Sequence, residues 1–164
     1  MEHTKTKRIL LVCTGNIGRS PLAAALLQRA LAQRGIDGLD VASAGTGAWD
    51  GAPVSEGAYL VGLERGLDLS AHRARLLTRE LVEEADLILT MARHHRARVD
   101  ELGGETRVFV LGEYAGREGD AAEVSDPFGG DLEVYRDTCV ELEALIDTAV
   151  ERIVKEFASG GNQR

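Results

Sequence analysis

Short apolar runs alternate along the chain with longer segments in which apolar residues recur every three or four positions. The short runs predict β-strands at 8–12, 39–44, 86–91 and 107–111. The longer segments predict helices at 20–34, 54–65, 78–85, 92–102 and 132–157, and the Gly- and acid-rich segment 112–131 predicts one long loop. Because strands that are apolar throughout need cover on both sides, we predict an α/β fold: a four-stranded parallel sheet with helices on both faces, in three α/β/α layers.

The length and composition are those of one ordinary globular domain over residues 1–164, with flexible ends at 1–6 and 159–164. Two cysteines are too few for a disulfide framework or a Cys-rich zinc site, and they favour a reducing cytoplasm. The first residues lack the apolar core of a signal peptide, and no run of about 18 apolar residues predicts a membrane span. We therefore expect a cytoplasmic protein, with secretion without a signal peptide left open.

The charge is unevenly distributed. The formal net charge is −8, which argues against binding to nucleic acid or to an anionic membrane. Residues 1–50, 51–100 and 101–164 carry +2, −1 and −9, respectively. An anion-binding site is therefore expected in the first third of the chain.

The segment that follows the first strand has the features of an anion-binding loop. It holds two glycines and an asparagine, and it leads into a helix with Ser20 as its expected cap and Pro21 in its first turn. Cys13 lies at one end and Arg19 follows six residues later. A cysteine at a strand end is often only a small apolar residue, but here a thiolate would meet a helix N-terminus and an arginine. We interpret Cys13 as a nucleophile and Arg19 as a clamp for phosphate oxygens.

When a phosphate ester is cleaved, the departing oxygen needs a proton. No histidine lies in a loop that follows a strand candidate, so histidine is not the expected donor. A carboxyl group is the expected donor. Asp126 is a candidate, although Asp-Pro is also an ordinary turn opener. Its rivals are Asp50, Asp120 and Asp131.

Other reactive side chains have structural interpretations. Cys139 lies on the apolar stripe of the last helix and is expected in the core. The helix predicted at 92–102 is basic and is expected to present a solvated face or, alternatively, a docking patch for an acidic partner. This face would consist of Arg93, His94, His95, Arg96 and Arg98.

The sequence CTGNIGRSP, from Cys13 to Pro21, resembles the phosphate-binding loop of the low-molecular-weight protein tyrosine phosphatases. The resemblance covers essentially the whole chain. Further motifs follow in the family's order, with SAGT at 43–46, HRAR at 72–75 before a Leu-Thr pair, and DPF at 126–128. The resemblance implies the phosphotyrosine protein phosphatase I-like fold, in agreement with the predicted strands and helices.

The resemblance also implies roles for individual residues. Cys13 would be the nucleophile, Arg19 the phosphate clamp and Asp126 the general acid, with no metal ion and no cofactor. The expected phosphate-binding loop consists of Cys13, Thr14, Gly15, Asn16, Ile17, Gly18 and Arg19. Asn16 would join a supporting network with Ser20, Ser43 and His72. Trp49 and Phe128 would form the aromatic walls of the cleft.

Several positions depart from patterns found in the family. Gly18 stands where many members have a second cysteine that forms a protective disulfide, and Phe128 and Gly129 replace two tyrosines that are phosphorylated in eukaryotic members. Ile17 stands where the family's phosphoarginine phosphatases have threonine. We therefore expect phosphotyrosine proteins as substrates, and phosphoarginine as the alternative.

Two other functions remain less favoured alternatives. Thiol-coupled arsenate reductases share this loop but need further cysteines around 70–95, where the chain has none. A non-catalytic phosphate-binding module conflicts with the presence of nucleophile, clamp and acid. The expected protein is a monomer that acts on the products of a tyrosine kinase.

Overall fold

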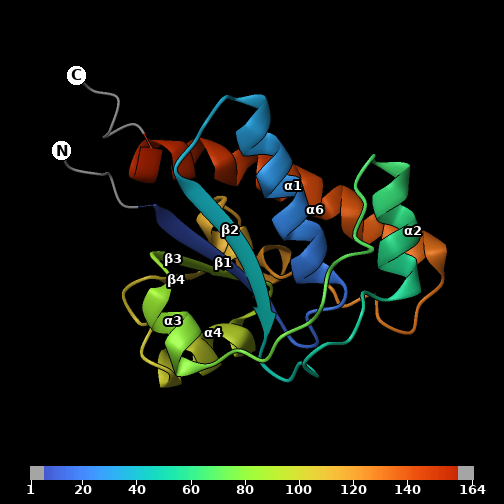
Figure 1. The fold of residues 1–164 in the computed structure, drawn as a ribbon, viewed down its shortest axis with the longest axis horizontal. Helices are drawn as coiled ribbons and strands as arrows, with labels where there is room; N and C mark the ends of the chain where they lie inside the picture. Colours follow the sequence, from blue (N-terminus) through green and yellow to red (C-terminus); the bar gives the residue numbers. More distant parts are fainter. Residues whose placement is uncertain (1–5, 159–164) are drawn as a thin grey trace.

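The computed structural model describes residues 6–158 (Figure 1). The elements in chain order are β1 (Lys7–Cys13), α1 (Arg19–Gln33), β2 (Leu39–Gly45), α2 (Glu56–Glu64), α3 (Arg79–Glu84), β3 (Leu87–Thr90), α4 (Arg93–Glu101), β4 (Val108–Val110), α5 (Leu111–Tyr114), a 3₁₀ turn η1 (Gly119–Ala122), α6 (Leu132–Ile153) and a π-helical turn η2 (Val154–Ala158). The ends predicted to be flexible, 1–6 and 159–164, lie outside the described residues apart from Thr6. No helix in the described part is long and apolar enough to cross a membrane.

The four strands form one parallel sheet in the order β2-β1-β3-β4, as the apolar runs predicted. Cys13 at the end of β1 pairs with Gly45 at the end of β2, so the carboxyl ends of both strands share one edge. The chain order reverses at β1, which lies between β2 and β3. In open α/β sheets a ligand crevice forms at this edge, beside such a reversal.

Alternate side chains of β1 enter two different cores, because successive residues of a strand point to opposite faces. Ile9 and Leu11 join the larger core with α1 and α6, whereas Leu10 and Val12 join a smaller core with α3 and α4. Figure 1 shows these pairs of helices on opposite sides of the sheet, with α2 next to α6. The predicted three-layer α/β/α arrangement is confirmed.

The prediction of one long loop over 112–131 was wrong in its first part. Helix α5 and turn η1 occupy part of this segment, and Tyr114 and Ala122 are buried. A side chain at Gly112 would overlap the Ala122 backbone, so this glycine permits close packing. The Tyr114 hydroxyl donates to Glu156 over 2.8 Å, a tertiary contact that local composition does not reveal.

Candidate active site

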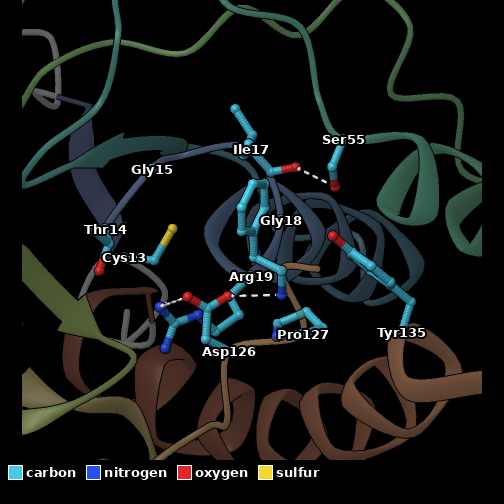
Figure 2. Close-up of a pocket in the computed structure, with 11 residues that line it drawn as sticks. Cys13, Thr14, Gly15, Ile17, Gly18, Arg19, Ser55, Asp126, Pro127 and Tyr135 are labelled. Atoms are coloured by element: carbon cyan, nitrogen blue, oxygen red, sulfur yellow. Dashed lines mark hydrogen bonds and ion pairs between the residues drawn. The ribbon is translucent and has the colours of Figure 1, made fainter. Parts of the chain in front are cut away.

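A cavity of about 190 Å³ opens at the carboxyl end of β1 (Figure 2). The structure brings the three residues predicted to be catalytic together in its lining: Cys13, Arg19 and Asp126. Cys13 is the last residue of β1, and Arg19 is the first residue of α1. The loop between them therefore turns its backbone around a point just before the N-terminus of a helix, where anions bind well.

Two hydrogen-bond donors meet the sulfur of Cys13. The backbone N–H of Asn16 lies 3.3 Å from Sγ, and the Ser20 hydroxyl lies 2.9 Å from it. An ionised sulfur can only accept, so the Ser20 hydroxyl then donates to it, while the Ser20 oxygen accepts a bond of 2.8 Å from Asn16 Nδ2. A sulfur that carries negative charge during reaction needs such donors.

The start of α1 corrects one sequence prediction. The helix begins at Arg19 with Gly18 as N-cap, and no side chain caps it. Ser20 is therefore not the cap but lies in the first turn, where its hydroxyl lies 2.9 Å from the Cys13 sulfur.

Asn16 holds the loop in shape from its centre. It is fully buried and has a left-handed backbone conformation (φ 57°), which asparagine tolerates better than most residues. Its Nδ2 group donates to Ser20 and, over 2.9 Å, to Ser43, while its Oδ1 accepts the N–H of Arg75 over 3.0 Å. Its backbone carbonyl accepts from His72 Nε2 over 2.7 Å. The structure thus brings the predicted supporting network together.

The tautomer of His72 follows from this contact. A carbonyl oxygen only accepts, so Nε2 of His72 must carry a proton. Burial is the main cause that lowers the pKa of His72, and the nearby Arg73 and Arg75 lower it further, although the bond to Asn16 opposes them. His72 therefore acts as a neutral donor.

The guanidinium group of Arg19 and the carboxyl group of Asp126 lie next to each other in the cavity lining, as Figure 2 shows. The Arg19 side chain is only 5% exposed, and its Nη1 donates to the Val124 carbonyl over 3.0 Å. Its Nη2 lies 3.5 Å from Asp126 Oδ2. The other oxygen of Asp126 accepts the Phe128 N–H over 3.1 Å, so this residue opens a turn and also presents a carboxyl group to the site.

The three other candidate proton donors, Asp50, Asp120 and Asp131, do not line this cavity. Asp50 accepts the N–H of Leu76 over 2.7 Å, and Asp131 caps α6 by accepting from Val134 over 3.1 Å. Neither lines the cavity, whereas Asp120 lines a neighbouring one. The geometry therefore favours Asp126 as proton donor.

The walls of the cavity are largely apolar and consist of Ile17, Pro127, Phe128 and Tyr135. Phe128 lies at the rim and is 70% exposed. The structure does not bring Trp49 to this cavity: its side chain is 80% exposed and does not belong to the lining. The aromatic residue that takes its place deeper in the cleft is Tyr135 on α6.

Sequence reasoning missed Tyr135 and Ser55 as cavity residues. Tyr135 belongs to the apolar stripe of the last helix, and nothing in that pattern distinguishes it from a core residue. Gly57 makes room for its ring, because a side chain at Gly57 would overlap it. Ser55 donates its N–H over 2.9 Å and its hydroxyl over 3.1 Å to the Ile17 carbonyl.

His95 was also misplaced by the sequence analysis. His94 is exposed, as a solvated face requires, but His95 is 0% exposed. Its Nδ1 accepts the Ala92 N–H over 3.0 Å, and its Nε2 lies 2.8 Å from the hydroxyl oxygen of Thr14. Burial, with smaller effects of His94 and Arg19, lowers the pKa of His95 to about 3. A neutral imidazole thus contacts the loop from Cys13 to Arg19 from a second side.

The remaining reactive groups add no further chemistry to the cavity. Cys139 is a buried free thiol in the larger core, as predicted. Between residues 6 and 158, no three His, Cys, Asp or Glu side chains converge so that they could hold a metal ion.

Comparisons with known proteins agree with this geometry. Residues 8–159 match the family model described as low molecular weight phosphotyrosine protein phosphatase. A protein-arginine-phosphatase of Geobacillus stearothermophilus is 40% identical over 91% of this chain and 97% of its own. A probable low molecular weight protein-tyrosine-phosphatase, EpsP of Ralstonia solanacearum, is 40% identical over 90% and 96%.

A solved structure shows the same likeness in three dimensions. It is YwlE arginine phosphatase, a cysteine-to-serine mutant with a phosphorylated active-site serine, and it has a TM-score of 0.84 at 35% identity. The alignment covers 92% of this chain and 97% of that one. Family model, relatives and fold agree, and the chain belongs to the low-molecular-weight protein tyrosine phosphatase family.

Proposed function

We propose that this phosphatase hydrolyses phosphotyrosine in proteins through a cysteinyl-phosphate on Cys13. The observation that carries the proposal is one cavity in which the Cys13 sulfur, the buried Arg19 and the carboxyl group of Asp126 meet below apolar walls. An apolar wall favours an aromatic leaving group, and the three polar groups supply nucleophile, clamp and acid.

The first step transfers the phosphoryl group to the enzyme. The Cys13 sulfur attacks phosphorus in line, the bond from phosphorus to the tyrosyl oxygen breaks, and Asp126 gives its proton to that oxygen. Loop N–H groups and Arg19 hold the equatorial oxygens, where negative charge gathers.

The second step releases phosphate. Water attacks phosphorus, its proton goes to Asp126, and the electron pair of the breaking P–S bond returns to sulfur. Because the cycle starts from an ionised thiol and a protonated carboxyl group, we expect an acidic to neutral pH optimum.

Phosphoarginine is the second candidate substrate, because the Geobacillus relative and the YwlE structure are named arginine phosphatases. Ile17 argues for phosphotyrosine, since it adds an apolar residue to the lining of the cavity. We expect Ile17→Thr to lower the ratio of phosphotyrosine to phosphoarginine hydrolysis.

The deciding experiment compares kcat/KM on matched phosphotyrosine, phosphoserine and phosphoarginine peptides. We expect phosphotyrosine to be the best substrate and Cys13→Ser to abolish turnover. We expect Asp126→Ala to reduce kcat by roughly 10²- to 10⁴-fold, most strongly for poor leaving groups. Turnover that survives in Cys13→Ser would exclude the mechanism, and a clear phosphoarginine preference would overturn the substrate assignment.

The biological setting is part of the same proposal. We infer a cytoplasmic monomer that opposes a tyrosine kinase, on the grounds of two free thiols and a cavity formed within one chain. Size-exclusion chromatography with light scattering tests the monomer, and a stable dimer would contradict it.

A further inference from the structure

A second cavity meets the active site at the phosphate loop. It has a volume of about 420 Å³, and it shares Thr14, Arg19 and Asp126 with the first cavity. Its other lining residues are Ala92, His94, Asp120, Glu123, Val124 and Ser125. Polar and charged groups dominate this lining, in contrast to the apolar walls of the first cavity. The Asp126 carboxyl group therefore belongs to the lining of both cavities, one apolar and one polar.

Thr14 belongs to the lining of both cavities. Its backbone carbonyl accepts the Gly47 N–H over 2.9 Å, and its side chain carries a hydroxyl group. The hydroxyl proton of Thr14 does not point to His95. Since Nδ1 of His95 accepts from the Ala92 N–H, the ring proton is on Nε2, and Nε2 donates to the Thr14 oxygen. The hydroxyl proton of Thr14 remains available, because among the described residues no acceptor is recorded for it.

We propose that Thr14, oriented by His95, positions the water that hydrolyses the cysteinyl-phosphate. The inference rests on the proposed function, since it concerns the second step of that reaction. The Thr14 hydroxyl donates to the water oxygen next to Asp126 and leaves both water protons free, one of which passes to the carboxylate. The water oxygen bonds to phosphorus, the P–S bond breaks, and its electron pair returns to the sulfur of Cys13. His95 touches neither substrate nor water and is a positioning residue.

If His95 only stabilised the start of α4, its variants would behave differently. His95 is the third residue of α4, where an acceptor for the backbone N–H of Ala92 stabilises the start of a helix. The two ring nitrogens therefore separate the two roles. Asparagine can keep the acceptor near the position of Nδ1 but is too short to reach Thr14. Glutamine can place an amide N–H near the position of Nε2 but loses the acceptor for Ala92.

The test measures formation and decay of the cysteinyl-phosphate separately by rapid quench, with p-nitrophenyl phosphate as the probe. We expect Thr14→Val and His95→Asn to slow decay about tenfold, the effect of one lost hydrogen bond, and to leave formation within about twofold. His95→Gln should keep decay near the wild-type rate. The control Thr138→Val removes a buried threonine hydroxyl that donates to Val134 on α6, and it should change neither rate.

The outcomes separate this inference from the proposed function. Unchanged decay in Thr14→Val would overturn it, and so would normal decay in His95→Asn with slow decay in His95→Gln, which would make His95 a helix cap. Equal losses in formation and decay would also overturn it, because they indicate a distorted loop. If the wild type forms no cysteinyl-phosphate, the proposed function fails and this inference fails with it.

Discussion

Replacement of Asn16 tests whether one side chain both stabilises the phosphate loop and directs a proton to the nucleophile. Asn16→Ala removes the three side-chain hydrogen bonds to Ser20, Ser43 and the N–H of Arg75, all buried or partly buried. Each is worth about 1 kcal/mol, and alanine in the left-handed conformation costs about 1 kcal/mol more. We expect the free energy of unfolding to fall by about 4 kcal/mol, a large share of a typical 5–15 kcal/mol.

Asn16→Asp separates the catalytic part of this effect from the structural part. Aspartate keeps the shape and an acceptor for the Arg75 N–H, but it replaces the Nδ2 donor with a second acceptor. The hydroxyls of Ser20 and Ser43 must then turn to donate to the carboxylate, so Ser20 no longer donates to the Cys13 sulfur. Loss of a hydrogen bond to a charged group predicts a decrease in kcat of roughly 10- to 100-fold. The added negative charge beside the nucleophile acts in the same direction.

Three measurements check this reasoning: urea denaturation, kcat on p-nitrophenyl phosphate, and the rate at which iodoacetate alkylates Cys13. Ser43→Ala is the matched control, since it removes a partner of Asn16 that does not touch the sulfur. It should cost about 1 kcal/mol in stability and change alkylation less than Asn16→Asp does. Wild-type kcat and alkylation in Asn16→Asp would refute the assigned direction of the Ser20 proton.

Further predictions concern redox protection, pH and the cavity wall. A Cβ atom at Gly18 would meet no atom within 4 Å, so we expect Gly18→Cys to fold. It should increase the activity that dithiothreitol recovers after peroxide treatment, and equal recovery in the variant and the wild type would contradict this. The folded state keeps His95 neutral to about pH 3 whereas the unfolded chain protonates near pH 6.5, so its stabilising effect is present above pH 6.5 and is lost as pH falls. Urea titrations should show about 2 kcal/mol less stability at pH 5 than at pH 7, a loss that His95→Gln removes. Gly57→Ala should displace the Tyr135 ring and raise KM for aryl phosphates more than KM for small alkyl phosphates, and equal effects on both would exclude an aromatic contact.

The parts of the site that could be predicted are those that are local in sequence. The loop from Cys13 to Arg19 connects a strand to a helix, and glycines, asparagine and the helix start lie within a few residues of each other. The local sequence alone does not identify Asp126 as a site residue, because an Asp-Pro turn has the same sequence whether or not its carboxyl group faces a nucleophile. Family resemblance, not the local pattern, distinguished it from its rivals.

The parts that could not be predicted depend on tertiary packing. Apolar periodicity placed Tyr135 on the buried face of α6 but could not show that its ring reaches a cavity, which depends on Gly57 in another helix. Charge pattern placed His95 among exposed basic residues, although its position at the third residue of a helix suits an acceptor for the N-cap. Trp49 shows the converse, since a tryptophan in a loop gives no sign of whether it faces the cleft or solvent.

The two histidines that hold the phosphate loop are suited to the acidic conditions that the proposed mechanism requires. Protonation of His72 adds a proton at Nδ1, for which no partner is recorded between residues 6 and 158, and leaves the Nε2 bond to Asn16 in place. Protonation of His95 would break its bond from the Ala92 N–H, because that bond needs a bare Nδ1. Burial lowers the pKa of His95 to about 3, so this bond persists through mildly acidic pH. The loop can therefore keep its geometry at a pH where the general acid Asp126 must hold a proton.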